Sequence, residues 1–488
     1  MHISYDDWEP VIGLEIHVQL NTQTKLFSSA PNQFGSEPNT NISYVDTGQP
    51  GALPVLNKEA VKKAVLFGLA IGSDISTFSK FDRKSYFYPD SPRNYQITQF
   101  DYPILKGGII AIQIGGKELT IPIDRAHLED DAGMLKHFSN FAGIDFNRAG
   151  VPLLEIVSMP CMHSPQEAIL FATEIKAIME YIGASDCNME EGSLRVDVNI
   201  SVRKRGESTL RNKVEIKNLN SFNVMEQAIE SEIRRQIGAY CLSPYKNPKE
   251  VIRSATVRFD MEKKTTVIMR MKEHAADYRY FPEPDLPPII LTDAYIQELK
   301  NSLPELPAER RNRYINEFHL SEYQASTLVI NKELSDFFEE GLQFLSNPIA
   351  LCNWIIVEFV GRVKDSGKTL PRYGISIQHI TQLVQLIESK TITGKIAKNI
   401  ADVMVLHPQK SPQQIIQENP DFIPIHDTAV LETMIDQVIK ENPQSCVDYR
   451  NGKEKAYHFL VGQVMKTSRG KADPNLVQDI LLKKIQLN

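Results

Sequence analysis

Two stretches of this chain alternate apolar and polar residues so regularly that they fit only strands with one buried face. Every even position of residues 12–20 is apolar, and residues 194–203 repeat the pattern with five aliphatic side chains. Successive side chains of a strand point to opposite faces, so a period of two predicts half-buried β-structure. We therefore expect an antiparallel sheet with one polar face, and any chemistry on that face.

Proline-rich segments divide the rest of the chain. Four prolines lie within residues 281–288, where neither a helix nor a central strand can continue. We expect this segment to be an extended exit from a strand-rich first domain, because helical patterns follow it. A second break falls at His407–Pro408. The expected class is α+β, with a strand-rich sheet domain, a helical domain and a further helical region at residues 1–292, 293–406 and 407–488.

Composition excludes several classes of protein. The 488 residues hold 54 Lys and Arg against 61 Asp and Glu, a net charge of −7 that argues against a uniformly basic nucleic-acid binder. Five cysteines lie far apart without a CxxC pair, which argues against a disulfide framework or a zinc ribbon. No secretory signal or membrane-spanning run is visible, so we expect a cytoplasmic protein with no membrane association.

The polar strand faces carry candidate metal ligands. Glu15 and His17 project from one face, about 7 Å apart along the strand. Arg195 and Asp197 share the polar face of the second stretch, and a hairpin would bring Glu215 of a third strand onto the same surface. Carboxylates and an imidazole on one face can bind Mg²⁺, Mn²⁺ or Zn²⁺. The alternative is a solvated face of a half-buried sheet, since alternation alone also places polar residues there.

Other segments add charged candidates. Glu155 stands inside an otherwise apolar run, where an ionised carboxylate is costly unless it is paired or metal-bound. Glu129 begins three consecutive acids, which form either a metal-binding loop or a solvated acidic turn. Arg83 and Lys84 lie among the aromatic residues of 81–90, a mixture that suits stacking on a base or binding a phosphate; an aromatic edge of the core is the alternative.

The C-terminal region has a charge of its own. Residues 451–488 hold seven cations against three anions, a net +4. Three of the cations, Lys466, Arg469 and Lys471, fall within six residues, which favours contact with a phosphate backbone over a merely solvated helix face.

The common nucleotide and hydrolase motifs are missing. The chain has no GxxxxGK[ST], no GxGxxG after a strand, no GxSxG and no HExxH. Residue patterns alone therefore lead to acid-rich metal chemistry on an antiparallel sheet and no further.

Several longer segments resemble one family, the B subunits (GatB) of the glutamine-dependent aspartyl/glutamyl-tRNA amidotransferases GatCAB. They follow in order along almost the whole chain, at residues 11–20, 50–57, 81–84, 127–133, 147–157, 188–195, 217–222 and 277–285, and residues 462–474 resemble the YqeY-like tail of the family. One departure is clear: residues 44–49 lack the cysteine pair that many members carry, so a zinc role attributed to it is absent.

The resemblance implies a fold, a reaction and partners. The sheet domain would resemble the cradle of glutamine synthetase and would phosphorylate, with ATP and Mg²⁺, the side-chain carboxylate of Glu-tRNA(Gln) or Asp-tRNA(Asn). Ammonia, supplied by a glutamine-hydrolysing partner subunit (GatA), would then displace phosphate. A small third subunit (GatC) would wrap the pair. The other hypotheses are a stand-alone metallohydrolase and a non-catalytic tRNA-binding scaffold.

Residue roles follow from the strand faces together with the resemblance. The catalytic and metal-binding set is Glu15, His17, Glu129, Asp197 and Glu215, with Glu155 as a further metal ligand. The expected ATP or substrate contacts are Arg83, Lys84 and Arg195, and the expected tRNA contacts are Lys466, Arg469 and Lys471.

Overall fold

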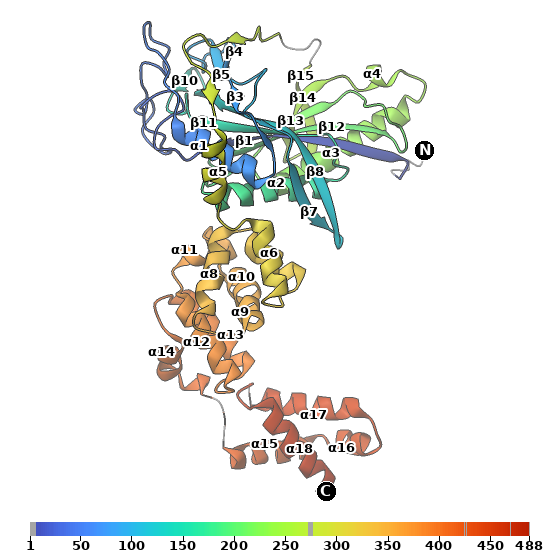
Figure 1. Cartoon of the computed structure of the whole chain (residues 1–488). Coiled ribbons are helices and arrows are strands. Elements are labelled where there is room, and N and C mark those ends of the chain that lie inside the picture. The colour runs from blue at the N-terminus through green and yellow to red at the C-terminus, as the bar shows by residue number, and fades with distance from the viewer. Residues whose placement is uncertain (1–5, 272–276, 424, 426, 469, 488) are drawn as a thin grey trace. The chain divides into compact units, whose positions relative to one another are not determined.

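The two strands expected from alternation lie side by side at the centre of a large sheet in the computed structural model (Figure 1). The sheet runs in the order β15-β14-β13-β12-β1-β11-β8-β6-β2, and β7 pairs with β8. The strands are β1 (Trp8–Gln19), β2 (Asp74–Ile75), β6 (Leu105–Lys106), β7 (Ile109–Ile114), β8 (Lys117–Asp130), β11 (Pro152–Ser158), β12 (Leu194–Lys204), β13 (Val214–Leu219), β14 (Ala255–Asp260) and β15 (Thr265–Met271).

The structure describes residues 6–271, 277–423, 425, 427–468 and 470–487. The chain divides into two units, Met1–Pro307 and Ala308–Asn488, which are treated separately. A sheet unit followed by a helical unit confirms the α+β class. The division into three domains stays a prediction.

One strand pair departs from the expected antiparallel pattern. Strands β13 and β14 are parallel, whereas the hairpin expected between β12 and β13 is antiparallel as predicted. A parallel pair needs a crossover connection. The chain supplies it with α3 (Phe222–Leu242) and α4 (Pro248–Val251), which separate the two strands.

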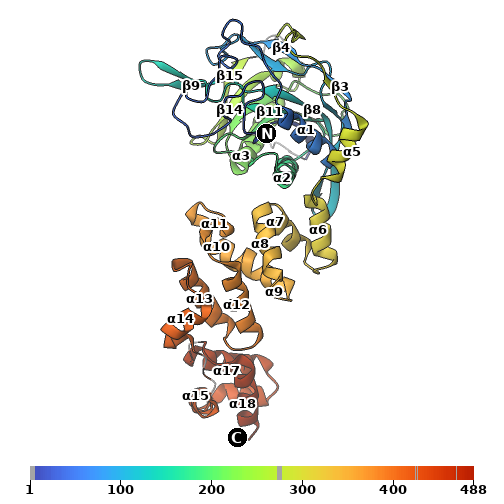
Figure 2. The ribbon, with the colours of Figure 1, turned by 60° about the vertical axis from the view of Figure 1, so that its left-hand side comes forward.

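Helices cover the apolar face of the sheet. The apolar residues of β1 at even positions, Ile12, Leu14, Ile16 and Val18, are at most 1% exposed. They join one core with α1 (Lys58–Ala70), α2 (Pro165–Tyr181) and α3, and Figure 2 shows α2 and α3 beneath the sheet. Ser164 caps α2 by accepting a hydrogen bond from the Glu167 amide. Because one face is covered in this way, the polar face is left to line a cavity.

Short strands lie outside the large sheet, and those at residues 82–85 and 95–98 form the wall above its polar face. They are β3 (Phe78–Ser79), β4 (Asp82–Ser85), β5 (Tyr95–Thr98), β9 (Met134–His137), β10 (Ala142–Asp145), β16 (Phe281–Pro282) and β17 (Ile289–Ile290). The proline-rich segment is extended, as expected, but it does not leave the unit: β16 pairs with β4 and β17 with β3. Proline is tolerated there because edge strands need fewer amide donors. Helix α5 (Asp293–Asn301) then packs on α1.

The second unit is helical. Ser321 begins α7 with a capping box that it forms with Gln324. The last four helices share a core that includes Leu431, Leu460 and Leu481. Within the described residues, no helix is long and apolar enough to cross a membrane. The α-helices are α6 (Pro307–Asn316), α7 (Glu322–Val329), α8 (Lys332–Leu342), α9 (Pro348–Asn353), α10 (Val360–Val363), α11 (Leu370–Tyr373), α12 (Ile377–Glu388), α13 (Gly394–Leu406), α14 (Pro412–Glu418), α15 (Thr428–Glu441), α16 (Pro443–Arg450), α17 (Glu454–Thr467) and α18 (Pro474–Leu487), with a π-helical segment at Trp354–Phe359 and 3₁₀ turns at Lys364–Ser366 and Pro420–Phe422.

Candidate active site

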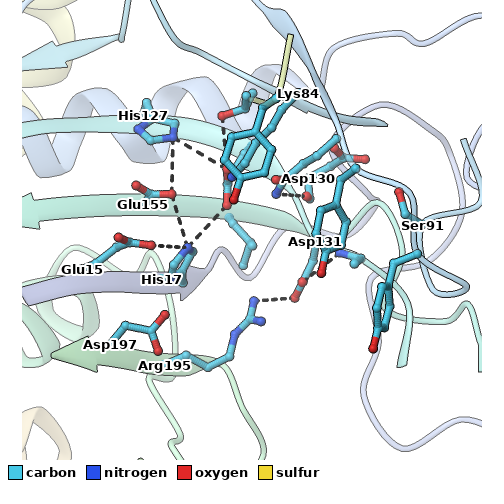
Figure 3. A pocket seen from close by; sticks show the side chains of 18 of the residues that line it. Glu15, His17, Lys84, Ser91, His127, Asp130, Asp131, Glu155, Arg195 and Asp197 are labelled. Atoms are coloured by element: carbon cyan, nitrogen blue, oxygen red, sulfur yellow. Dashed lines mark hydrogen bonds and ion pairs between the residues drawn. The ribbon is translucent and has the colours of Figure 1, made fainter. Parts of the chain in front are cut away.

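Strand register aligns four charged or polar residues across the middle of the sheet. His17 on β1 lies opposite Glu155 on β11 and opposite Arg195 on β12, and Glu155 lies opposite His127 on β8. Side chains directly opposite each other on neighbouring strands are near enough to interact. Figure 3 shows this row on the polar face, from His127 through Glu155 and His17 to Arg195.

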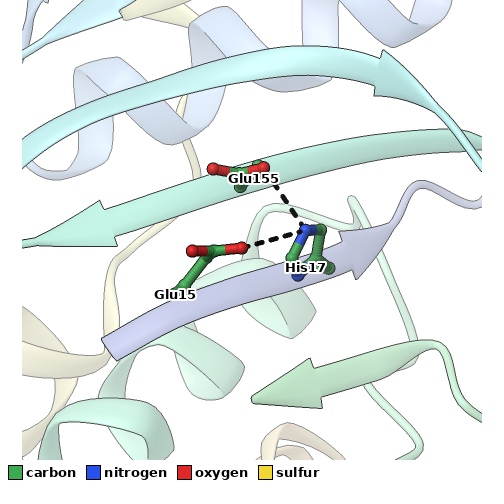
Figure 4. Close-up of side chains that lie close together, drawn as sticks. All are labelled: Glu15, His17 and Glu155. Atoms are coloured by element: carbon green, nitrogen blue, oxygen red, sulfur yellow. Dashed lines mark ion pairs between the residues drawn. The ribbon is translucent and has the colours of Figure 1, made fainter. Parts of the chain in front are cut away.

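Carboxylates gather around the two imidazoles of this row. The Nε2 atom of His17 lies 3.3 Å from Glu155 Oε2, 3.6 Å from Glu129 Oε1 and 3.8 Å from Glu15 Oε1. The contacts with Glu15 and Glu155 are drawn in Figure 4. His127 Nε2 lies 3.6 Å from Glu155 Oε2 and 3.7 Å from Glu129 Oε2. We call these five residues, Glu15, His17, His127, Glu129 and Glu155, the carboxylate–imidazole cluster.

The cluster carries an excess of negative charge in a largely buried position. Burial raises the pKa of the Glu155 carboxyl, but the charges of His127 and His17 outweigh it and hold that pKa below its usual range. Burial lowers the pKa of His17, yet the hydrogen bond and charge of Glu155, together with the charge of Glu129, raise it to about 9. The pKa of Glu15 rises through burial and the nearby charge of Glu155. Such an electrostatic field favours a bound cation.

The donor set fits a divalent metal ion. Two groups of ligand atoms, Glu15–His17–Glu155 and His127–Glu129–Glu155, each lie within 4.8 Å of one another and share Glu155. Carboxylate oxygens and imidazole nitrogens together suit Mg²⁺, Mn²⁺ or Zn²⁺. Both imidazoles turn Nε2 toward the carboxylates. The residues present therefore match a metal site.

Two of the sequence-predicted ligands lie outside the cluster. Asp197 is opposite Glu15 on β12 and forms an ion pair with Lys217, whose Nζ is also 3.2 Å from Glu215 Oε1. Thr256 Oγ1 donates a hydrogen bond of 3.0 Å to the other oxygen of Glu215. Burial lowers the pKa of the Lys217 ammonium, but Asp197 and Glu215 raise it overall. Both carboxylates therefore pair with a lysine, and their role as metal ligands stays a prediction.

The two adjacent cations of β4 face different ways. Lys84 lines the cavity over the cluster, where burial lowers the pKa of its ammonium but the charges of Glu129 and of the other acidic groups raise it overall. Arg83 donates two hydrogen bonds of 2.8 Å to Glu283 and a third of 3.2 Å to Asp285. Arg83 is not one of the described residues that line the cavity. Its guanidinium holds the proline-rich segment to β4, so its placement does not support the predicted ATP contact.

The three consecutive acids of residues 129–131 have different partners. Only Glu129 joins the cluster. Asp130 pairs with Arg93 and accepts a hydrogen bond of 2.9 Å from the Ile97 amide. Asp131 accepts one of 2.6 Å from Arg195. Arg195 therefore lies at the edge of the cluster, positioned by a buried carboxylate.

Sequence reasoning missed His127 and Lys217. The first carried a readable signal: His127 and Glu129 stand two residues apart on one strand, which is the Glu15–His17 spacing in reverse order. Across the described part of the chain, the His127 Nδ1 atom has no hydrogen-bond partner, so Nε2 is its only engaged nitrogen. Lys217 had no such signal, because its role depends on the pairing of β12 with β13.

A cavity of about 870 Å³ rises above the polar face. The cluster, Lys84 and Arg195 line it, together with several tyrosines from the wall. A volume of this size suits a ligand larger than a metal ion alone.

The predicted tRNA contacts lie in the second unit. Lys466 is in the last turn of α17, and Lys471 follows that helix. Arg469 lies outside the described residues.

Comparison with known proteins identifies the family. Residues 10–297 match the model described as the GatB/GatE catalytic domain, and residues 336–485 match the GatB domain. The chain belongs to the GatB family. It is similar to the B subunit of the aspartyl/glutamyl-tRNA(Asn/Gln) amidotransferase from Protochlamydia amoebophila, with 60% identity over 484 residues, 99% of this chain and 98% of the relative. The proteins of the same name from Chlamydia abortus and Chlamydia pneumoniae are 58% and 56% identical, over 98% and 99% of both chains.

The GatB family assignment confirms the predicted family and the predicted role as an amidotransferase component. The whole carboxylate–imidazole cluster lies inside the match to the GatB/GatE catalytic domain. Lys466 and Lys471 lie inside the match to the GatB domain.

Proposed function

We propose that this chain phosphorylates, with ATP, the side-chain carboxylate of Glu on tRNA(Gln) or of Asp on tRNA(Asn), and that ammonia then converts the acyl phosphate to an amide. The carboxylate–imidazole cluster at the base of a cavity of about 870 Å³, inside the GatB/GatE catalytic match, is the observation that carries this proposal. The names of its relatives supply the tRNA substrates.

The chemistry requires activation before amidation. A carboxylate is a poor electrophile, so its oxygen first attacks the γ-phosphorus of ATP and ADP leaves. Ammonia nitrogen then attacks the carbonyl carbon of the acyl phosphate, and inorganic phosphate leaves with the transferred oxygen. Positioning and charge neutralisation dominate such phosphoryl transfer. This fits a site built from carboxylates, imidazoles and cations.

Named residues have separate tasks in this proposal. Glu15, His17, His127, Glu129 and Glu155 would hold Mg²⁺, which when bound neutralises charge on the transferring phosphoryl group. Lys84 and Arg195 line the same cavity as fixed cations for the phosphates or the substrate carboxylate. Asp197 and Glu215 are proposed to keep Lys217 in place beside the cluster.

Ammonia is proposed to come from another protein of the same complex. The sequence shows no Ser-Ser-Lys amidase signature, so hydrolysis of glutamine falls to a partner of the GatA type, with a small protein of the GatC type completing the complex. The relatives are named as subunits, which supports an assembly of several chains.

Reconstitution tests the function directly. The chain would be combined with its amidase and small partners, γ-³²P-ATP and misacylated tRNA, and we expect radiolabelled acyl phosphate that forms only when tRNA is present. Turnover without ATP or tRNA would instead favour a metallohydrolase. Full amidation by the His17→Ala complex would favour a non-catalytic scaffold.

A further inference from the structure

The aromatic segment of residues 81–90 divides into a core part and a cavity part. Phe81 is 2% exposed and packs edge-on against Phe27, with ring centroids 5.2 Å apart, so it belongs to the core. Tyr86 and Tyr88 are 40% and 50% exposed and line the cavity. Their rings stack at 5.8 Å with an interplanar angle of 25°. A core-edge explanation therefore covers only Phe81.

A second aromatic segment reaches the same cavity from far along the chain. The pairing of β16 with β4 brings Tyr278 beside the first segment, and the Ser85 amide donates a hydrogen bond of 2.9 Å to the Tyr278 carbonyl. Tyr280 lies flat on Phe100, with centroids 4.0 Å apart. All these rings line the cavity, and we call them the aromatic rim: Tyr86, Tyr88, Phe100, Tyr278 and Tyr280.

An arginine next to the rim has no acidic partner among the described residues. Strand pairing aligns Thr256 of β14 with Arg270 of β15, and Arg270 lines the cavity. Its charge is near enough to oppose the rise that burial causes in the pKa of Tyr86. Arg93 and Arg195, which also line the cavity, are engaged by Asp130 and Asp131. Over the described ranges, Arg270 forms no ion pair, so its charge is available to an anion.

We infer that the aromatic rim is a nucleotide subsite, in which Tyr86 and Tyr88 stack on a nucleobase and Arg270 binds a phosphate of the same nucleotide. Exposed rings grouped around a cavity are typical of a binding site, and every nucleobase has a flat face for stacking. This inference rests on the proposed function, which brings two such nucleotides into one cavity: ATP and the 3′-terminal nucleotide of the aminoacyl-tRNA. The shared chemistry is a base beside a phosphate.

The test compares ligands with and without the base. Complexes reconstituted with the partner proteins would carry Tyr86→Leu, Tyr88→Leu or Arg270→Gln, and Phe87→Leu is the matched control. Phe87 stands between the two tyrosines and is 74% exposed, and it is absent from the described cavity lining. Equilibrium binding would be measured for ATP, for inorganic tripolyphosphate, and for aminoacyl-tRNA beside tRNA lacking its terminal adenosine.

Stacking predicts a loss confined to base-bearing ligands. Each tyrosine variant should weaken the binding of either ATP or aminoacyl-tRNA about tenfold, while tripolyphosphate binding stays unchanged. A loss for ATP assigns the rim to the adenine of ATP, whereas a loss for intact tRNA alone assigns it to the tRNA end. Arg270→Gln should weaken the same ligand as the tyrosine variants, and Phe87→Leu should weaken none.

Two results would overturn the subsite. The first is that both tyrosine variants bind ATP and aminoacyl-tRNA with affinities within twofold of wild type. The second is that Phe87→Leu loses as much affinity as the tyrosine variants do. In either case tRNA-dependent acyl phosphate from the wild-type complex would leave the proposed function standing. A wild-type complex that makes no acyl phosphate would contradict the function itself.

Discussion

At the scale of single residues, His17 is the point where the charges of the site meet. Its Nε2 atom is within 3.8 Å of oxygens from Glu15, Glu129 and Glu155. The negative charges of Glu155 and Glu129 stabilise the protonated imidazole, so the pKa of His17 rises to about 9 although burial lowers it. A metal ion and that proton neutralise the same carboxylates, so they compete for one place.

Removing this imidazole should remove the metal. We expect His17→Ala to lower Mg²⁺ affinity more than about 100-fold and to abolish ATP-dependent amidation. Mutation of a residue that only hydrogen-bonds to a metal ligand already lowers metal affinity about 10–100-fold. Calorimetric Mg²⁺ titration measures the first and product formation the second, while tRNA binding should stay nearly unchanged. His137→Ala, at an exposed histidine of β9, is the control. Unaltered Mg²⁺ binding would mean that His17 is not a metal ligand.

Lys217 should behave as the partner of Asp197 and Glu215. Lys217→Met leaves two largely buried carboxylates without their cation, and we expect it to lower the free energy of unfolding by about 1–3 kcal/mol. Adding Asp197→Asn should recover part of the loss, because it removes one uncompensated charge. Urea unfolding of the wild type, both single variants and the double variant measures the coupling. Strict additivity would show that the pair is not coupled.

The ion pairs of Asp131 predict the direction in which the stability of the protein changes with pH. Burial raises the pKa of its carboxyl, but Arg195 and Arg148 lower it overall from the ordinary 3.8. An acid with a lowered folded pKa stabilises the protein above its unfolded pKa, and this stability is lost as the pH falls through the folded value. In Arg195→Met we therefore expect a shallower fall of stability below about pH 4. Unfolding midpoints of the variant and of the wild type, measured across that pH range, give this difference. An identical loss of stability in acid would argue against the pairing of Asp131 with Arg195.

At the scale of elements, alternation was enough to predict β1 and β12, but pairing between distant strands was not readable. Glu155 meets His127 only because β11 lies between β1 and β8, and no local pattern carries that order. The faces of Arg83 and Lys84 show the same limit. Alternation places them on opposite faces of β4, but which of the two faces inward depends on β16, about 200 residues later.

Local signals were reliable where one side chain satisfies a neighbouring backbone group. Ser164 and Ser321 each stand three residues before a Glu or Gln, a pattern typical of a helix start, and they cap α2 and α7. The proline-rich segment shows the opposite case, because its extended conformation was predictable whereas its pairing back onto β3 and β4 was not.

The Ser164 cap can be tested by itself. Ser164→Ala removes the acceptor of the Glu167 amide, and we expect a loss of about 1 kcal/mol in the free energy of unfolding. Ser139→Ala, exposed in the turn between β9 and β10, should lose much less. Urea midpoints at neutral pH compare the two variants. Equal midpoints would mean that the cap contributes little to α2.

At the scale of the whole molecule, charge is unevenly distributed along the chain. Residues 451–488 carry +4 although the total is −7. Some of these cations are engaged inside the second unit: Lys484 Nζ is 2.6 Å from Asp436 Oδ2, and Lys453 Nζ is 3.2 Å from Asp448 Oδ1. We propose that Lys466 and Lys471 contact the tRNA backbone.

Substitution tests this tail better than deletion. Removing the chain after Glu441 would uncover the apolar face of α15, which packs on α17 and α18. We expect Lys466→Gln with Lys471→Gln to weaken tRNA binding by the complex and to lower the slope of log affinity against log salt by about 1 per lysine. ATP binding should persist. Lys453→Gln is the control, and an unchanged slope in the double variant would assign the tail another task.

The pairing of β4 with β16 and of β3 with β17 also determines when this protein becomes competent during its synthesis. Side chains between Lys84 and Phe100 line the cavity together with Tyr278 and Tyr280, and a nascent chain halted before residue 281 has neither β16 nor β17. On the ribosome the whole carboxylate–imidazole cluster is translated by residue 155, well before Tyr278 and Tyr280, which line the cavity above it. Maturation of the catalytic unit therefore waits for its last strands, and loop closure across nearly two hundred residues makes that step late and slow.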